Sequence, residues 1–458
     1  MLNVVAVANL RILPIMAIVG LQAIFYYLVA FVFFLIPSGF IFAELGCRYA
    51  NNGGVYSWVK AAFGNNAGVC ALWMEWINNV IAFPATLAMI VATLSYSGLF
   101  SHHLNPDETC MIMILILWGI SFYNLLGQKA ANLLSSFGTV CGVFLPALIL
   151  VALAGTWVSM GHVSAFQAHQ QAFIPSLSSG SVAILVAVMS AYSGLQVSGF
   201  HANQVKKPEV NFPKAIFFSG IILFFITCLG SLAIYVIMFP AKINIENGVA
   251  QGLASLLRVF HLSWLTPYFA IGIALGAIAS LSAWFVGPAK GVAYAAKEGG
   301  LPACLARLNK VNMPIVVMLA QSVIATLICL IFLIMPSAKE AFWVLIILTS
   351  QFTVLTYVLV FLAAIRLRAR NSNNRSGLYL LRGHKCLNVL SVVGVILCLV
   401  AFVFGVLPPA RLQFGHAFTY TIMVIGGDAI IIVMPLLWGL VTRMRMNEGF
   451  FAPSNNKS

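Results

Sequence analysis

Two short polar segments interrupt long apolar stretches of this 458-residue chain: Asn9–Arg11 and Tyr192–Gly194. A helix in a bilayer satisfies its own backbone groups, so an interruption is tolerated where the freed groups line a cavity. Amide groups at the start of a half-helix can hold a carboxylate, and freed carbonyls can accept hydrogen bonds from an ammonium group. The two segments, including Leu10 and Ser193, therefore predict a site for a polar substrate near the middle of a membrane carrier.

Arg11 is the charged member of the first segment. An arginine inside the membrane is costly unless it faces a cavity or a partner, and it is a functional candidate by default. Its planar guanidinium could bind a substrate carboxylate through two parallel hydrogen bonds. The alternative is a gate or structural role, as an ion pair with Glu75 or a contact to loop carbonyls.

Other candidate side chains lie farther along the chain. Glu75, in the motif WMEWINN, lies one or two turns inside an apolar span, where it could titrate or, more simply, be a neutralised or paired structural acid. Tyr26, Trp76 and Tyr357 are candidates for a pocket wall or a gate, with packing or lipid-belt roles as the alternative.

The elements that must position these residues are membrane-spanning helices. Hydrophobic residues make up 62% of the chain and charged residues 7%. Runs of about 20 apolar residues indicate an all-α, polytopic membrane protein. Twelve transmembrane helices are expected, with spans 1 and 6 discontinuous, at 2–20, 22–45, 68–98, 110–127, 132–158, 180–200, 214–239, 266–290, 314–335, 340–366, 388–408 and 418–442.

The two discontinuous spans are expected to be unwound at 9–13 and 190–195, and they are five spans apart. The alternative is that Pro14 is an ordinary kink and Gly194 an ordinary packing glycine, both frequent in membrane helices. With an odd number of spans in each unit, the second unit must be inverted in the membrane. We therefore expect one five-helix repeat over 1–160, an inverted repeat over 178–368, two extra helices over 386–443 and a short cytoplasmic tail over 444–458. Asp428 lies outside the ten-helix core, so we expect it to be structural or to face another subunit of a homo-oligomer.

Basic residues predict the orientation. If segment 46–66 is cytoplasmic, nineteen of the 24 Lys and Arg residues lie inside, only Lys242, Arg258, Lys339 and Arg411 lie outside, and Arg11 is within a span. This bias places both termini in the cytoplasm. The net charge of +14 is thus a topology signal and gives no support to a nucleic-acid partner. Eight residues before the first break form about 12 Å of helix, which is short for half a span and leaves open a start farther upstream.

Several function classes receive no support from the sequence. The nine cysteines are scattered, mostly inside spans and without paired spacing, so we expect no disulfide, metal site or cofactor. There is no HExxH, GxSxG or phosphate-loop motif, so we do not expect an enzyme. A membrane-embedded enzyme, a receptor or a channel are remote alternatives.

Three longer motifs resemble the amino acid–polyamine–organocation superfamily, in order and at family spacing. They are GGVYSWVKAAFG (Gly53–Gly64), GLQVSGFHANQVKKPEVNFPKA (Gly194–Ala215) and WFVGPAKGVAYAAKEGGLPACLARLNKVNMPIVV (Trp284–Val317). The last two are most similar to the glutamate:GABA antiporter branch. The resemblance implies a LeuT-type fold in the cytoplasmic membrane, backbone recognition of amino acids, and exchange without an obligatory ion gradient.

The resemblance also bears on individual residues. It implies that span 8, with Trp284, lies beside the substrate pocket. Gln196, a further substrate-binding candidate, stands where the family often has an acid. The short tail cannot supply the pathway plug of the acid-resistance members, so glutamate and GABA are not settled as the exchanged pair.

Ion-coupled symport of the same fold is the alternative to exchange. Proton-coupled relatives carry a lysine in span 5, and residues 132–158 contain none. A sodium site would need hydroxyl groups on span 8, where Ser280 and Ser282 are present but are also common packing residues. Exchange is therefore the expected activity.

Overall fold

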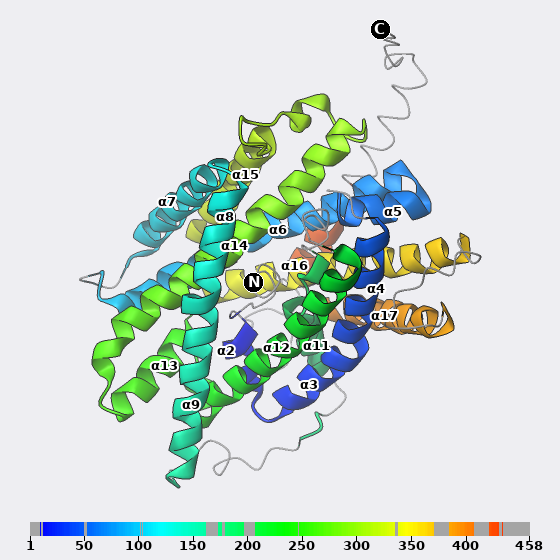
Figure 1. Ribbon diagram of the computed structural model, residues 1–458. Coiled ribbons are helices and arrows are strands. Elements are labelled where there is room, and N and C mark those ends of the chain that lie inside the picture. Colours follow the sequence, from blue (N-terminus) through cyan, green and yellow to red (C-terminus); the bar gives the residue numbers. More distant parts are fainter. Residues whose placement is uncertain are drawn as a thin grey trace.

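The structure is a computed structural model. It describes residues 10, 12–49, 53–100, 102, 104–161, 173–175, 179–196, 207–245, 247–334, 338–370, 384–406, 421–429 and 433. Over these residues the chain is helical and contains no strand (Figure 1). The longer helices are α2 (Ile12–Val19), α3 (Gln22–Ala30), α4 (Ile36–Arg48), α5 (Val55–Phe63), α6 (Asn65–Leu94), α7 (Pro106–Leu125), α8 (Gln128–Gly138), α9 (Leu145–Ser159), α11 (Ser179–Ala191), α12 (Pro208–Ile237), α13 (Gly248–Val259), α14 (Thr266–Lys297), α15 (Ile315–Ile334), α16 (Ala338–Arg370) and α17 (His384–Gly405).

Short helical turns complete these elements. Two π-helical turns join consecutive helices into single spans: η1 (Phe31–Leu35) between α3 and α4, and η3 (Thr139–Phe144) between α8 and α9. The 3₁₀ turns are η2 (Ser95–Ser97), η5 (Pro240–Lys242), η6 (Ser263–Leu265) and η7 (Ala303–Ala306).

Eight helical stretches of the described chain are long and apolar enough to cross a membrane. They match predicted spans 2–5, 7, 8, 10 and 11, and they are Gln22–Arg48, Asn65–Ser97, Pro106–Leu125, Gln128–Ser159, Pro213–Ile237, Ser263–Lys297, Leu345–Arg370 and Lys385–Gly405. Predicted spans 1 and 6 contain the short helices α2 and α11, span 9 contains the shorter apolar helix Ile315–Leu330, and span 12 is described only in part. The expected all-α, polytopic membrane fold is confirmed.

The sixth span is interrupted within the predicted segment 190–195, but Ser190 and Ala191 still belong to α11. Helix α11 ends at Ala191, and Ser193 and Gly194 lie outside any helix. Gly194 has a φ of 123°, a backbone conformation that residues other than glycine rarely adopt. In the first span, α2 begins at Ile12, whereas Asn9 and Arg11 lie outside the described residues. In that span, Ile12 and Leu13 were expected to be unwound and instead belong to α2.

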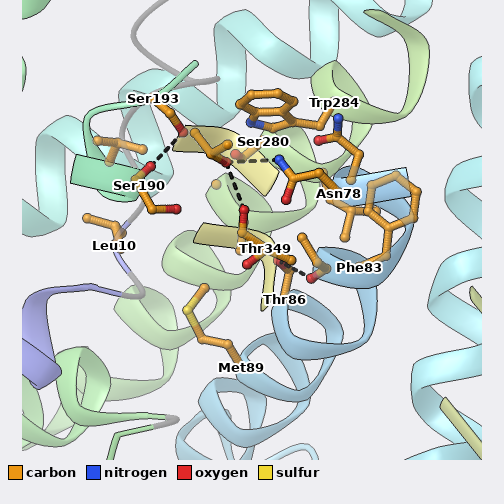
Figure 2. Close-up of a pocket in the computed structure, with 17 residues that line it drawn as sticks. Leu10, Asn78, Phe83, Thr86, Met89, Ser190, Ser193, Ser280, Trp284 and Thr349 are labelled. Carbon is orange, nitrogen blue, oxygen red and sulfur yellow. Dashed lines mark hydrogen bonds between the residues drawn. The ribbon is translucent and has the colours of Figure 1, made fainter. Parts of the chain in front are cut away.

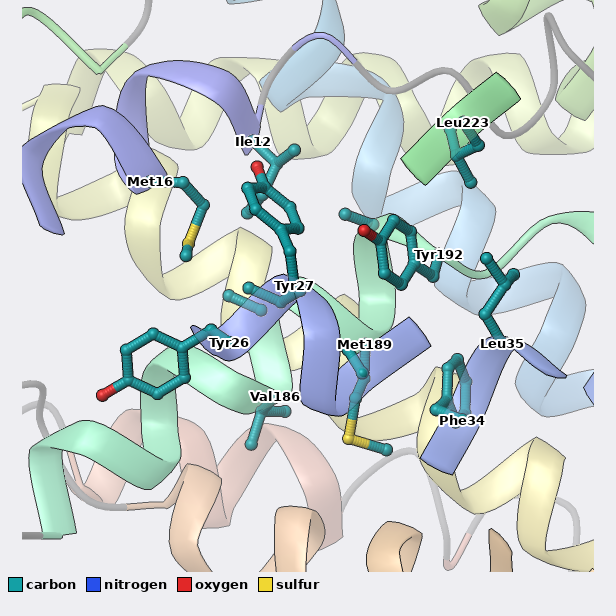
Figure 3. Close-up of a cluster of buried hydrophobic side chains, with 14 of the residues drawn as sticks. Ile12, Met16, Tyr26, Tyr27, Phe34, Leu35, Val186, Met189, Tyr192 and Leu223 are labelled. Atoms are coloured by element: carbon teal, nitrogen blue, oxygen red, sulfur yellow. The ribbon is translucent and has the colours of Figure 1, made fainter. Parts of the chain in front are cut away.

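Buried apolar side chains form two large clusters built from different spans. The first cluster joins α2, α3, α4, α5, α9, α11, α12, α13, α16 and α17, and it also includes Ala71 and Ala85 of α6 and Ile273 of α14. Figure 3 shows part of it, where the Tyr27 and Tyr192 rings lie 5.9 Å apart and the Tyr27 hydroxyl is 2.9 Å from Ser231 Oγ. The second cluster joins α6, α7, α14 and α15, and includes Leu117 and Phe285. The molecule thus has two packed helix groups rather than one continuous core.

Ion pairs gather at the end of the molecule that carries α5. Lys60 Nζ of α5 lies 2.5 Å from Glu298 Oε2, just after α14. Burial alone would raise the pKa of the Glu298 carboxyl, but hydrogen bonds from Lys60 and Tyr294 outweigh burial and lower it. Arg368 of α16 donates from Nε to Glu44 Oε2 of α4 at 2.8 Å, and this pair is buried. These contacts fix α4, α5, α14 and α16 together at one end.

Candidate functional site

A polar cavity lies between the two helix groups, beside both the interruption of span 6 and the start of α2. It leaves about 790 Å³ free of protein atoms, counting the part open to its surroundings. Helices α6 and α14 supply one side, and Leu10, α11, Ser193 and α16 supply much of the other (Figure 2). The lining residues are Leu10, Asn78, Asn79, Ala82, Phe83, Thr86, Met89, Val143, Ser190, Ser193, Gly276, Ala277, Ser280, Leu281, Trp284, Thr349 and Thr353.

Some of the polar groups of the cavity form hydrogen bonds with one another. Asn78 Nδ2 donates to Thr353 Oγ1 at 3.0 Å, which bridges α6 and α16 across the two helix groups. Ser193 Oγ donates to the Ser190 carbonyl at 2.6 Å, which satisfies one of the groups freed by the interruption. Asn78 Oδ1 is buried and accepts no hydrogen bond. Because a buried acceptor without a donor is costly, this oxygen is suited to receive a donor from a bound molecule.

A second set of polar side chains lies beneath the cavity, and we call Glu75, Gln196 and Tyr357 the polar layer. Gln196 is its centre. Its Oε1 accepts from the Tyr357 hydroxyl at 2.6 Å and from the Gly194 amide at 2.8 Å, and its Nε2 donates to Glu75 Oε1 at 3.1 Å. Glu75 is 0% exposed, and Gln196 and Tyr357 are 0–1% exposed, so the polar layer is sealed.

The polar layer is one helical turn away from the cavity lining on α6 and α16, where Glu75 precedes Asn78 and Tyr357 follows Thr353. Residues three or four apart share a helix face, so each of these two pairs is stacked along its helix. Gln196 follows Ser193 in the non-helical segment after α11. On α6 and α16 the shift is toward the α5 end, because α6 starts beside α5 and Arg370 at the end of α16 donates to the Ala61 carbonyl. The polar layer therefore separates the cavity from the α5 end.

The predicted substrate-binding residues lie in different parts of the structure. Leu10, Ser193 and Trp284 line the cavity. The Tyr192 side chain instead packs in the first apolar cluster, with its hydroxyl 3.3 Å from Thr227 Oγ1 on α12. The two residues that flank Leu10, namely Asn9 and Arg11, lie outside the described residues, so their proposed roles stay predictions.

The predicted wall and gate residues also lie in different parts of the structure. Glu75, Gln196 and Tyr357 meet in the polar layer, and Gly194 contributes its amide to it. Tyr26 is buried in the first apolar cluster, where its hydroxyl points away from Tyr27 and Tyr192 (Figure 3). Trp76 donates from Nε1 to Gln321 Oε1 of α15 at 3.0 Å, within the second helix group. Neither Tyr26 nor Trp76 lines the cavity.

Most of the neutral polar side chains of the cavity were not among the predicted site residues. Asn78 and Asn79 follow Glu75 by three and four residues, a spacing that places them one turn farther along the same helix. That spacing was available from the motif WMEWINN. Ser190 belongs to the segment predicted to interrupt span 6, whereas Thr86, Thr349 and Thr353 stand in ordinary apolar runs and carry no local signal.

The hydroxyl groups considered for a sodium site are separated. Ser280 lines the cavity, whereas Ser282 is buried and donates to Asn124 Oδ1 of α7 at 2.6 Å. Ser282 thus serves helix packing between α14 and α7. Within the described part of the chain, no cluster of three or more His, Cys, Asp or Glu side chains could hold a metal ion.

Comparison with known proteins places this architecture in a family. The profile of the amino acid permease family matches residues 2–427. An uncharacterised transporter of Legionella pneumophila is 34% identical over 441 residues, which cover 96% of this chain and 94% of the relative. A glutamate/gamma-aminobutyrate antiporter of Lactococcus lactis is 26% identical, with 93% of this chain and 86% of the relative covered. A probable agmatine/putrescine antiporter of the same species is 24% identical, with coverage of 86% and 83%.

These matches and the apolar helices agree on a transporter embedded in the cell membrane, and not an enzyme. The chain belongs to the amino acid permease family, within the amino acid–polyamine–organocation superfamily.

Proposed function

We propose that this protein is an amino acid exchanger that works by alternating access, in the manner of the glutamate/gamma-aminobutyrate antiporters. The observation that carries this proposal is the position of the polar cavity, which lies between two separately packed helix groups and beside the interruption of span 6. Discontinuous helices at the interface of two structural units are typical of secondary transporters.

Substrate recognition is proposed to use both backbone and side-chain groups. The segment from Asn9 to Arg11 would present amide groups to the α-carboxylate, and the carbonyls of Tyr192, Ser193 and Gly194 would accept from the α-ammonium. Asn78 Oδ1, which is unpaired at the cavity, adds a side-chain acceptor. Thr86, Met89 and the α14 face around Ala277 would then contact the substrate side chain.

Access is proposed to change when the two helix groups rock against each other. Two hydrogen bonds cross between the groups at the cavity and the polar layer: Asn78 to Thr353 and Gln196 to Glu75. Breaking these two bonds would let α11 and α16 move from α6 and open the cavity toward the α5 end. In this proposal the polar layer is the gate on that side.

Counterflow in proteoliposomes tests the proposed function. Purified protein is reconstituted into vesicles preloaded with one unlabelled amino acid from a panel, and uptake of labelled glutamate, gamma-aminobutyrate or a neutral amino acid is followed. An exchanger takes up label only when a substrate is present inside. Equal uptake into empty and loaded vesicles would contradict exchange, and no uptake from any member of the panel would contradict amino acid transport by this cavity.

A further inference from the structure

The Glu75 carboxyl has surroundings that the proposed exchange cycle does not explain. Glu75 lies ten residues from the start of α6, about 15 Å along the helix axis, and it is 0% exposed. Its Oε1 accepts one hydrogen bond from Gln196 Nε2, and its Oε2 is buried with no hydrogen-bond partner. Gln196 cannot turn its amide around, because its Oε1 is held by two donors, Gly194 N and the Tyr357 hydroxyl.

No cation compensates this carboxyl among the residues that the structure describes. The titratable group that faces it is the Tyr357 hydroxyl, on the far side of the Gln196 amide. Charged and titratable groups on the elements packed against α6 otherwise lie nearer the helix ends or have their own partners. Those whose side chains the structure describes are Tyr56 and Lys60 on α5, Tyr96 on η2, Asp107, Glu108, Cys110 and Tyr123 on α7, Tyr192 on α11, Tyr268, Lys290, Tyr294 and Lys297 on α14, Cys329 on α15, and Arg366, Arg368 and Arg370 on α16.

An ionised carboxylate in this position would be unfavourable. Removing a charge from water costs far more than one neutral hydrogen bond returns, and buried charges therefore need a counter-ion or several donors. The protonated carboxylic acid is uncharged, so it needs neither a counter-ion nor several donors. Its Oε1 accepts a hydrogen bond from Gln196, and its proton is on Oε2. The sealed polar layer thus fits the acid form of Glu75.

We propose that Glu75 is a proton-binding site linked to the gate. When the polar layer opens toward the α5 end, water reaches Glu75, the Oε2–H bond breaks and the proton passes to that water. When the layer closes, Glu75 takes a proton from water on the same side and Gln196 Nε2 re-forms its bond. The proton enters and leaves on one side, so exchange depends on pH without net proton transport. This inference rests on the proposed exchange function.

The linkage predicts the direction of the pH effect. Because the proton binds the closed gate in preference to the open one, acidification favours the closed gate. Exchange should therefore slow as pH falls through the range in which Glu75 titrates, by at most about tenfold per pH unit for one proton. Glu75→Gln has the shape and neutrality of the acid form, and it should keep the slow, acid-side rate of the wild type at every pH.

The experiment compares exchange of a zwitterionic amino acid between about pH 5.5 and 8, with the same buffer on both sides. Wild type should show the pH dependence, Glu75→Asp should keep it with a shifted midpoint, and Glu75→Gln should lose it. Asp428→Asn is the matched control, since Asp428 is also a buried acid but lies in the last span, and it should behave as wild type. A fluorescent pH probe inside the vesicles should record no net proton movement during exchange.

Two results would overturn the proposal while leaving exchange intact: an unaltered pH profile in Glu75→Gln, or one proton moved for each substrate. If no exchange occurs at any pH, the proposed function fails instead.

An infrared readout is independent of transport. A carboxylic-acid band that disappears as pH is raised should be present in Asp428→Asn and absent from the double variant Glu75→Gln/Asp428→Asn, and its persistence in the double variant would also overturn the proposal.

Discussion

At the scale of single residues, Gln196 has the densest set of contacts around the cavity. One side chain holds the amide of the interrupted span 6, a tyrosine of α16 and the buried acid of α6. A carboxylate at this position could accept the same two donors but could not donate to Glu75. The Gln196 amide can therefore lie beside the Glu75 carboxyl and donate a hydrogen bond to it, which an acid at position 196 could not do.

Gly194 is expected to tolerate no β-branched residue. Its φ of 123° is unfavourable for any side chain, at a cost on the order of 1–3 kcal/mol, and a branched side chain would also crowd the interruption. Gly194→Val should insert normally and lose exchange in the counterflow assay. Gly119→Val, at an exposed helical glycine with open space around it, is the control. Exchange at the wild-type rate by Gly194→Val would remove Gly194 from the site.

Asn78 is expected to contribute a substrate contact in addition to its bridge. A hydrogen bond to a charged group is worth about 1.5–3 kcal/mol, so Asn78→Leu should weaken apparent substrate affinity by roughly ten- to hundredfold. Thr353→Val removes the bridge partner but leaves Asn78 Oδ1 at the cavity. It should therefore cost less than Asn78→Leu in the same exchange measurement. Equal losses in the two variants would mean that only the bridge matters.

At the scale of elements, the close crossing of spans 5 and 8 sets one wall of the cavity. A Cβ at Gly142 would lie 2.2 Å from the Gly276 Cα, and a Cβ at Gly276 would lie 2.7 Å from the Gly142 Cα. The two backbones touch because neither glycine has a side chain. Small residues of this kind are common where membrane helices approach closely. Since Gly276 also lines the cavity, this crossing fixes the position of α14 relative to the site.

This crossing predicts a strong size effect at Gly142. Gly142→Leu must push η3 and α14 apart, and overpacking of this kind costs about 1–3 kcal/mol or more. Its melting temperature in detergent should fall well below that of wild type. Gly155→Leu lies on the same span with open space around it and should melt as wild type does. If both variants melt alike, the crossing is not as tight as the structure has it.

At the scale of the whole molecule, two apolar clusters meet across a polar cavity. The two clusters also touch, because Ala71 and Ala85 of α6 and Ile273 of α14 are buried in the first cluster. The contacts that join α4, α5, α14 and α16 gather at the α5 end. Rearrangement of this end is therefore the step that the proposed alternating access requires.

The orientation of the molecule can be tested with its own cysteines. Cys304 and Cys386 are exposed, and the remaining cysteines are buried or half-buried. Both exposed thiols lie at the α5 end, since Cys304 follows α14 and Cys386 begins the helix after α16. If this end is cytoplasmic, a membrane-impermeant maleimide should label inside-out vesicles and leave intact cells unlabelled. The Cys304→Ser/Cys386→Ser variant sets the background, and labelling of intact cells would invert the proposed topology.

The sequence alone determined the features that are local. The length of an apolar run decides whether a helix can cross a membrane, and this is why eight predicted spans have matching helices in the described chain. The interruption near Gly194 was also predictable, because polar segments break two apolar runs at matching positions, whereas a single glycine is equally typical of helix packing. The orientation and the repeat boundaries derive from charge and spacing, and they remain predictions.

The tertiary structure decided which side chains meet. Gln196 is separated by 121 residues from Glu75 and by 161 from Tyr357, so no local pattern could bring the polar layer together. Tyr26, Trp76 and Tyr357 had equal standing as wall or gate candidates, yet only Tyr357 belongs to the polar layer and none of the three lines the cavity. The physical reason is that a side chain's direction changes by about 100° with each residue of a helix. Which direction points to the cavity is then set by how the helices pack, not by the residue itself.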